Sequence, residues 1–341
     1  MTTINITYPT AVLTDQGGCP YNQDRGFVNP ATNSIGVFDG HGEFGHDAAR
    51  RATEEFDSAA AGDSLTDLFV AAEAAVTDSI RTATALPLEE GGAYYRRGAY
   101  GGRGAPVRGG TTASVVRVNP ETGAVTVANV GDSDVVLFDT DTDPGQSLIA
   151  DHSCTALHEW QRVHAAHPET RFTFHGPVRY PERPVWLEKT VMNPEEEAPW
   201  TLHPAGGFQY CDVRSSWATY LHASDGSESL AMTRALGDLN LKRHGVSAEP
   251  AIQEAAALPM GEGAPNTVRV IVIGSDGLWD PLQYEEVRAI VRRPAFLDLR
   301  DADGATAALM EKAKERGRAL MGPAYDNIAV AVVYVNAAGT E

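Results

Sequence analysis

The stretch Ile35-Gly36-Val37-Phe38-Asp39-Gly40-His41-Gly42 joins an apolar run to a polar, glycine-rich turn. This pattern predicts a buried strand that ends near Asp39 and delivers the following residues to an opening. A carboxylate and a glycine carbonyl are oxygen ligands of the kind that hard divalent cations prefer, and the imidazole of His41 suits proton transfer near neutral pH. Taken alone, the stretch could equally be an ordinary turn that carries Asp and His.

The composition is that of a folded, acidic chain. The 341 residues are 43% hydrophobic and 21% charged, and they contain no repeat or obvious linker, so we expect a single domain over residues 1–341. The net charge of −19 argues against binding to nucleic acid or to an anionic membrane. The three cysteines are few and widely spaced, which indicates a reducing compartment, and no signal-peptide-like or transmembrane stretch is present, so we expect a protein of the cytoplasm or nucleus. We also expect a monomer.

Periodicity predicts regular elements around the opening stretch. Residues 48–60 and 65–83 carry apolar residues at helical spacing and predict two amphipathic helices. The β-branched runs 111–118 and 124–130 flank Asn119-Pro120-Glu121-Thr122-Gly123 and predict a hairpin.

Two segments lack any periodicity. Residues 91–110 are rich in glycine and contain four arginines, which predicts a basic loop. Residues 168–226 are long, proline-rich and irregular, and a segment of this length is typical of an insertion.

Five aspartates fall at predicted strand ends or turns: Asp24, Asp39, Asp132, Asp276 and Asp326. Clustered carboxylates cannot all stay ionised without cations, although Asp132 could instead cap its glycine turn. Two divalent ions held only by oxygen, Mg²⁺ or Mn²⁺, with a water between them are a common device for phosphoester hydrolysis. No Gly-x-Ser-x-Gly motif is present, so a covalent route is not favoured.

Eight short motifs follow one another along the chain: Asn22-Gln23-Asp24, Asp39-Gly40-His41-Gly42, Gly109-Gly110-Thr111-Thr112-Ala113, Gly131-Asp132-Ser133, Asp151-His152 with Glu159 and Arg162, Thr233-Arg234-Ala235-Leu236-Gly237-Asp238, Ser275-Asp276-Gly277-Leu278-Trp279-Asp280 and Asp326-Asn327. In this order they resemble the type 2C (PPM) metal-dependent protein serine/threonine phosphatases. Any one motif is weak evidence, but eight in the right order over about the whole chain are specific.

The resemblance implies an α+β fold, a four-layer α-β-β-α sandwich of two packed antiparallel sheets flanked by helices. It implies hydrolysis of phosphoserine and phosphothreonine in proteins by direct attack of a water that bridges two metal ions. The ligands of the two Mg²⁺ or Mn²⁺ ions would be Asp24, Asp39, the carbonyl of Gly40, Asp276 and Asp326. Asp132 with Asp276 matches a weaker third metal site, and His41 matches the general acid for the leaving alkoxide.

The chain also departs from the family pattern. Cys19 stands where family members commonly carry an arginine that grips the substrate phosphate, and Asp134 stands where arginine is frequent. Because Cys19 offers no positive charge, two alternatives to a phosphoprotein phosphatase remain. One is a catalytically weak pseudophosphatase that acts as a binding module, and the other is a hydrolase of small phosphoesters.

Arg108 is the candidate to replace the missing phosphate grip. A hairpin turn centred near Glu121 would place Gly110 opposite Asp132, and Arg108 lies two residues from Gly110. A guanidinium suits a phosphate through its fork geometry and permanent charge. The competing interpretation is a surface loop whose arginines balance the acidic surface.

Overall fold

The computed structural model describes residues 8–84, 88–90, 93–97, 103–120, 122–154, 156–174, 188–189, 202–203, 207–210, 219–223, 226, 228–255 and 268–336. The helices are α1 (Gly45–Asp57), α2 (Leu65–Ala83), α3 (Leu157–Ala166), α4 (Asp276–Trp279), α5 (Tyr284–Val291), α6 (Pro294–Leu297) and α7 (Ala302–Met321). Both amphipathic helices predicted from periodicity are present, and α2 has the predicted bounds. None of the helices in the described ranges is long and apolar enough to cross a membrane.

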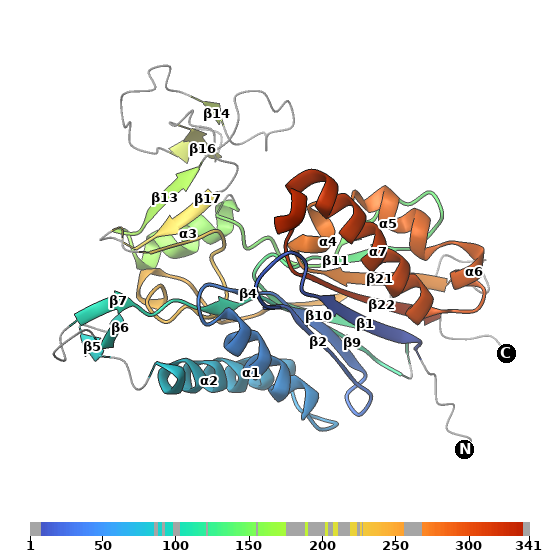
Figure 1. The fold of residues 1–341 in the computed structure, drawn as a ribbon, viewed down its shortest axis with the longest axis horizontal. Helices are drawn as coiled ribbons and strands as arrows, with labels where there is room; N and C mark the ends of the chain where they lie inside the picture. Colours follow the sequence, from blue (N-terminus) through green and yellow to red (C-terminus); the bar gives the residue numbers. More distant parts are fainter. Residues whose placement is uncertain are drawn as a thin grey trace.

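Two antiparallel five-stranded sheets form the centre of the molecule (Figure 1). The first sheet has the order β1 (Thr10–Asp15), β22 (Ile328–Asn336), β21 (Val268–Gly274), β11 (Val135–Phe138) and β12 (Gln146–Ser147). The second has the order β2 (Arg25–Asn29), β3 (Ser34–Phe38), β9 (Ala113–Val118), β10 (Val125–Val130) and β20 (Ala251–Ala255). Helices α4, α5 and α7 cover the first sheet, and α1 and α2 cover the second (Figure 1). The predicted four-layer α-β-β-α architecture is therefore confirmed.

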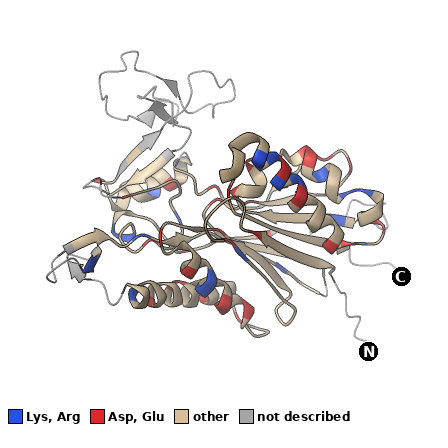
Figure 2. Ribbon diagram, in the orientation of Figure 1, with Lys and Arg blue, Asp and Glu red and all other residues tan. Residues whose placement is uncertain are grey.

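The central strands are apolar on both faces because each face meets another layer. In β21, Ile271 and Ile273 point into the core between the two sheets, while Val270 and Val272 pack against the helices. Side chains alternate in this way because successive residues of a strand point to opposite faces. Figure 2 shows the result, with charged residues concentrated on helices and at strand ends rather than along the central strands. A continuous apolar run in this chain thus predicts a strand buried on both sides.

A smaller sheet holds the turn that follows Asp39. It consists of β19 (Leu236–Gly237), β8 (Gly110–Thr111) and β4 (Gly40–His41). Gly110 pairs with both His41 and Gly237, so this sheet joins three segments that are far apart in sequence.

The predicted basic loop at residues 91–110 is partly regular in the structure. Strands β5 (Leu88–Glu90), β6 (Ala93–Arg97) and β7 (Arg103–Pro106) form a three-stranded antiparallel sheet, while residues 91–92 and 98–102 lie outside the described residues. The sheet is held by contacts that sequence periodicity does not report. Arg96 forms an ion pair with Glu43 and lies over the ring of Phe44, and Asn240 hydrogen-bonds to both the amide and the carbonyl of Tyr94.

Most of the predicted insertion at residues 168–226 lies outside the described residues. Its described parts are short strands: β17 (Thr219–His222) pairs with both β13 (Arg171–Phe174) and β18 (Ser229–Leu230), and β14 (Glu188–Lys189), β16 (Gly207–Tyr210) and β15 (Leu202–His203) form a second small sheet. Helix α3 lies beside β13 and β17 (Figure 1). That residues 168–226 are an insertion stays a prediction.

The predicted hairpin between residues 111 and 130 exists, but its predicted register was wrong. A turn centred near Glu121 would place Val118 opposite Ala124, whereas Val118 pairs with Val125 and Ala113 with Val130. The ladder ends at Ala113, and Gly110 pairs with His41 and Gly237 instead of lying opposite Asp132. Turn geometry sets the register of a hairpin, and Gly123 adopts a left-handed conformation with φ 68° that residue type alone did not fix.

The buried side chain of Asn29 links β2 to the end of α1. Its Nδ2 donates to the carbonyls of Phe56 at 3.0 Å and Ala59 at 2.9 Å, and its Oδ1 accepts from the amide of Ala31 at 2.9 Å. We expect Asn29→Ala to lower the free energy of unfolding by about 2–3 kcal/mol, because it leaves buried backbone groups without partners. Denaturant unfolding would measure this. The exposed Asn119→Ala is the control, and an equal loss in both variants would contradict the assignment.

Candidate metal centre

Asp24 and Asp39 lie at the same end of the β2–β3 hairpin. Arg25 pairs with Phe38 in the ladder, so the residue before β2 and the residue after β3 leave the sheet side by side. Asp24 is only 1% exposed, while Asp39 is partly exposed. The hairpin predicted from sequence therefore brings one buried and one accessible carboxylate to the same edge.

Asp276 and Asp326 reach this edge from the other sheet. Asp276 is the first residue of α4, directly after β21 and Ser275, and Asp326 precedes β22. Asp132 lies in the turn between β10 and β11. The side chains of these three residues are exposed. All three act electrostatically on Asp39, as does Asp24, so the five predicted aspartates share one region.

Two buried polar side chains tie the two sheets together at this edge. The hydroxyl of Ser275 donates to Asp24 Oδ2 at 2.7 Å and accepts from the amide of Ala329 at 2.9 Å. The Oδ1 of Asn327 accepts from the amide of Gln23 at 2.8 Å, and its Nδ2 donates to the carbonyl of Gln16 at 2.6 Å. These bonds fix the loop that carries Asp24 against the segments next to Asp276 and Asp326.

Thr112 supports the other two carboxylates. Its Oγ1 accepts from the amide of Asp39 at 3.0 Å and lies 2.7 Å from the hydroxyl of Ser133, the neighbour of Asp132. The sequence analysis named Ser275 and Thr112 only as members of motifs and did not predict these hydrogen bonds. The available signal was a small hydroxyl residue directly beside an apolar strand, which is a common pattern for a buried hydrogen bond.

The clustered aspartates carry like charges, and each carboxylate affects the pKa of its neighbours. Burial, followed by the charges of Asp24, Asp276, Asp132 and Asp326, raises the pKa of Asp39 well above its ordinary value. Burial and the charge of Asp326 raise the pKa of Asp24 to about 7 even though Ser275 donates to it. Asp276 keeps contact with solvent, but desolvation by the surrounding protein and the neighbouring carboxylates raise its pKa to about 8. Protons or cations must therefore offset this charge near neutral pH.

The donor chemistry fits hard divalent cations. The region offers carboxylate oxygens, with no thiolate among the predicted ligands. Gly40 is buried in β4, and no side chain fits at this position, because an added Cβ would lie 2.4 Å from the Gly45 carbonyl. Within the described part of the chain, no three Asp, Glu, His or Cys side chains already form a group that could hold a metal. The carboxylates are close enough to shift one another's pKa values, but their oxygens are not yet arranged as a complete metal-coordination site.

His41 contacts a carboxylate outside the cluster. Its Nε2 lies 2.7 Å from Oδ2 of Asp238, which is 7% exposed and has a left-handed backbone with φ 47°. The amide of Asp238 donates to the carbonyl of Gly109 at 2.8 Å, and Glu73 of α2 accepts from the amide of Gly237 at 2.7 Å. Burial lowers the pKa of His41, but the charge of Asp238 outweighs this and raises the pKa above its usual value. The sequence analysis named Asp238 only as the last residue of the Thr233–Asp238 motif and did not predict its contact with His41.

Arg108 and Cys19 lie at different parts of this region. Arg108 is exposed, its carbonyl accepts from the amide of Phe44 at 3.1 Å, and its charge acts on Glu228. The thiol of Cys19 lies 3.7 Å from Oδ1 of Asp326. The argument that placed Arg108 near Asp132 through Gly110 no longer holds, so its role as a phosphate ligand stays a prediction without that support.

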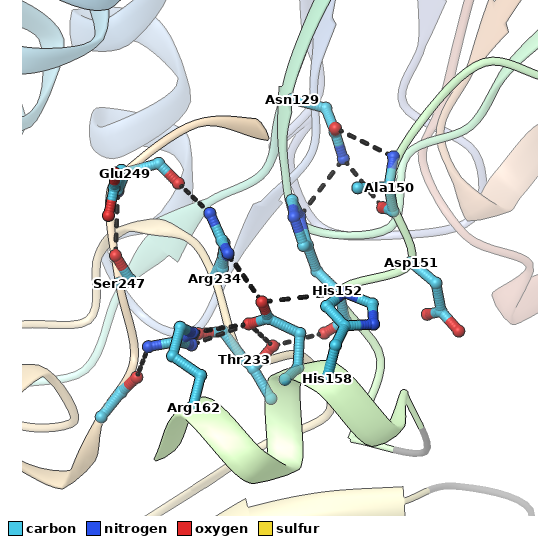
Figure 3. A network of polar contacts seen from close by, with 12 residues as sticks. Asn129, Ala150, Asp151, His152, His158, Arg162, Thr233, Arg234, Ser247 and Glu249 are labelled. Atoms are coloured by element: carbon cyan, nitrogen blue, oxygen red, sulfur yellow. Dashed lines mark hydrogen bonds and ion pairs between the residues drawn. The ribbon is translucent and has the colours of Figure 1, made fainter. Parts of the chain in front are cut away.

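A second polar network surrounds the buried carboxylate of Glu159 on α3, and Figure 3 shows the side chains of Arg162, Thr233 and Arg234 that take part in it. Arg162 and Arg234 each donate to it at 2.7 Å, and the hydroxyl of Thr233 donates at 2.7 Å. Burial raises the pKa of Glu159, but these hydrogen bonds outweigh it and lower the pKa to about 2. The network fixes the Thr233-Arg234 segment, which leads into β19 and Asp238.

Comparisons with known proteins point to one family. The family model described as "Protein phosphatase 2C" matches residues 14–173 and 216–319. A relative from Arabidopsis thaliana, "Probable protein phosphatase 2C 11", is 38% identical over 104 residues, which cover 30% of this chain and 23% of that protein. The match thus spans about a quarter of the length of that relative.

Solved structures share the fold at low sequence identity. The serine-threonine phosphatase 2C of Toxoplasma gondii is 17% identical with a TM-score of 0.59, and the match covers 98% of this chain and 96% of that one. The serine/threonine phosphatase PstP of Mycobacterium tuberculosis is 17% identical with a TM-score of 0.50, covering 96% and 98% of the two chains. A structure of the PstP catalytic domain contains two manganese ions.

The raised carboxyl pKa values predict a pH-dependent stability for the metal-free protein. Asp24 and Asp276 bind protons more tightly in the folded than in the unfolded chain, so the folded state carries more protons between pH 4 and 8. We expect the Tm in a chelator to fall as the pH rises through this range, and Mg²⁺ to raise the Tm more at pH 8 than at pH 5. Thermal melts at several pH values measure both effects, and a metal-free Tm that rises from pH 5 to pH 8 would contradict this account.

Proposed function

The chain belongs to the protein phosphatase 2C family, and on that premise we propose that it removes phosphate from phosphoserine and phosphothreonine in proteins. The observation that carries the proposal is the convergence of five carboxylates from both sheets at one edge. Its test is release of phosphate from phosphopeptides in the presence of Mn²⁺ or Mg²⁺.

Divalent cations would be held by oxygen ligands at this edge. The residues that would hold two ions are Asp24, Asp39, the carbonyl of Gly40, Asp276 and Asp326, and Asp132 with Asp276 would hold a weaker third. When bound, such ions supply positive charge for the phosphoryl oxygens and lower the pKa of a water molecule. Ser275 and Thr112 support this role because they orient Asp24 and Asp39.

His41 would donate the proton that the leaving alkoxide needs. A serine alkoxide leaves poorly without a proton, and a protonated imidazole can supply one near neutral pH. Because Nε2 of His41 faces Asp238, its Nδ1 is the nitrogen left to face the substrate. Asp238 would stabilise the protonated ring and fix its orientation, while Glu73 and Gly109 hold the segment that carries Asp238.

The metal assignment predicts that single ligand changes abolish activity. We expect Asp39→Asn and Asp276→Asn each to lower kcat on a phosphopeptide more than about 100-fold, because even contacts behind a metal ligand contribute 10- to 100-fold. Each variant should retain its fold, since it removes one of several repelling charges. Steady-state kinetics with Mn²⁺, circular dichroism and the control Asp78→Asn on the exposed face of α2 test this. Half of the wild-type turnover in either variant would contradict the assignment.

The role of His41 predicts a dependence on the leaving group. We expect His41→Ala to slow a phosphoserine peptide by roughly 10²- to 10⁴-fold and an aryl phosphate far less, because a phenolate leaves without a proton. Asp238→Asn should show the same pattern with a smaller decrease, since asparagine also tolerates the left-handed backbone. Equal slowing of both substrates in His41→Ala would indicate a structural role.

A further inference from the structure

Strand β19 carries Asp238 to its place beside His41, but its own sheet gives it little support. It is an edge strand of the small sheet β19-β8-β4, and it pairs with β8 through the two residues Leu236 and Gly237. Gly237 has a left-handed backbone with φ 79°, and Asp238 follows with φ 47°. The outward-facing amides of an edge strand have no partner within the sheet. Contacts from outside the sheet therefore help to set the position of Asp238.

Glu73 on α2 supplies one of these contacts. Its Oε2 accepts from the amide of Gly237 at 2.7 Å, and its Oε1 lies 3.3 Å from Nζ of Lys242. Nζ of Lys242 also donates to the carbonyl of Ala235 at 2.5 Å. The ion pair of Glu73 with Lys242 therefore holds the chain on both sides of the buried Leu236.

A carboxylate at this position of α2 carries a desolvation cost. Phe69 and Val76 lie four residues before and three residues after Glu73 and face the apolar core, so Glu73 borders the buried face of the helix. Its side chain is 24% exposed, and burial raises its pKa above the usual value although Lys242 and the Gly237 amide oppose this. An apolar side chain would avoid this cost, but it would leave the Gly237 amide without its acceptor.

The hold on Gly237 is passed directly to the contact between Asp238 and His41. The amide of Asp238 donates to the carbonyl of Gly109 at 2.8 Å, and an added Cβ on Gly110 would lie 2.2 Å from Oδ2 of Asp238. The carboxylate therefore lies closely against β8, and its Oδ2 reaches Nε2 of His41 at 2.7 Å. Because Asp238 is the next residue after Gly237, a shift of Gly237 would move this carboxylate relative to the imidazole.

We propose that Glu73 is a positioning residue for the pair of His41 and Asp238, and that it gives the site part of its selectivity for alkyl over aryl phosphates. The inference rests on the proposed phosphatase function, in which His41 donates a proton to the leaving alkoxide. Glu73 bonds to the backbone of β19, so it acts on His41 through Asp238. A phosphoserine ester needs the proton and an aryl phosphate does not, so a displaced Asp238 slows the first substrate and spares the second.

The experiment measures kcat and KM with Mn²⁺ on a phosphoserine peptide and on an aryl phosphate. We expect Glu73→Ala to lower kcat on the peptide about three- to tenfold, as for one lost hydrogen bond, with KM and the aryl phosphate rate within about twofold of wild type. Glu73→Met fills similar space without an acceptor and should match Glu73→Ala. Glu73→Gln keeps an oxygen for the Gly237 amide and should recover most of the loss. The control Asp78→Ala, on the exposed face of α2, should leave both rates unchanged.

Two further measurements separate positioning from a loss of stability. In the His41→Ala background, Glu73→Ala should change the peptide rate less than about twofold, because no imidazole is left to position. Asn29→Ala removes buried hydrogen bonds between β2 and the end of α1, so it should lower stability without changing the ratio of the two rates.

The outcomes distinguish this inference from the proposed function. The inference is wrong if Glu73→Ala and Glu73→Met leave the peptide rate unchanged, slow both substrates equally, or slow the peptide by the same factor with and without His41. The proposed function survives each of these results. No hydrolysis of any phosphopeptide or aryl phosphate by the wild-type protein with Mn²⁺ would overturn the proposed function and this inference with it.

Discussion

Repulsion between carboxylates at the shared edge of the two sheets is the constraint on which this structure depends. Asp24 and Asp39 arrive from one sheet and Asp276 and Asp326 from the other, so packing of the two sheets brings like charges together. The hydroxyl of Ser275 bridges the two sheets at this point. The hydrogen bonds of this hydroxyl stabilise the packed sheets against the repulsion when no cation is bound. A bound cation would attract the carboxylates of both sheets.

The layers around the sheets explain how such a charged edge can be tolerated. Strands such as β21 bury apolar side chains on both faces, and three separate hydrophobic clusters result. Burial on this scale contributes far more stabilising free energy than the edge costs. The core can therefore hold several like charges in positions that an isolated hairpin could not maintain.

The sequence alone predicted those parts of the site that depend on a single strand and the turn next to it. Aspartates at the ends of apolar runs were identified because a strand and its turn are local features, and the β2–β3 hairpin places Asp24 beside Asp39. Contacts between distant segments could not be read in this way. The predicted position of Gly110 opposite Asp132 depended on a hairpin register that the turn conformation shifted by one residue, whereas the actual pairing of Gly110 with His41 joins β8 to β4. The contact of Asp238 with His41 depends on a third strand, β19, which pairs with β8. The sheet of β5, β6 and β7 likewise depends on contacts with residues such as Asn240.

The left-handed backbone of Asp238 ties activity to conformational cost. A non-glycine residue with positive φ is strained by about 1 kcal/mol or more, and glycine would remove that strain. Glycine would also remove the carboxylate that faces His41. Selection for thermostability alone would therefore favour glycine at this position even though turnover would fall. A homologue or engineered variant with glycine here would be more stable and less active.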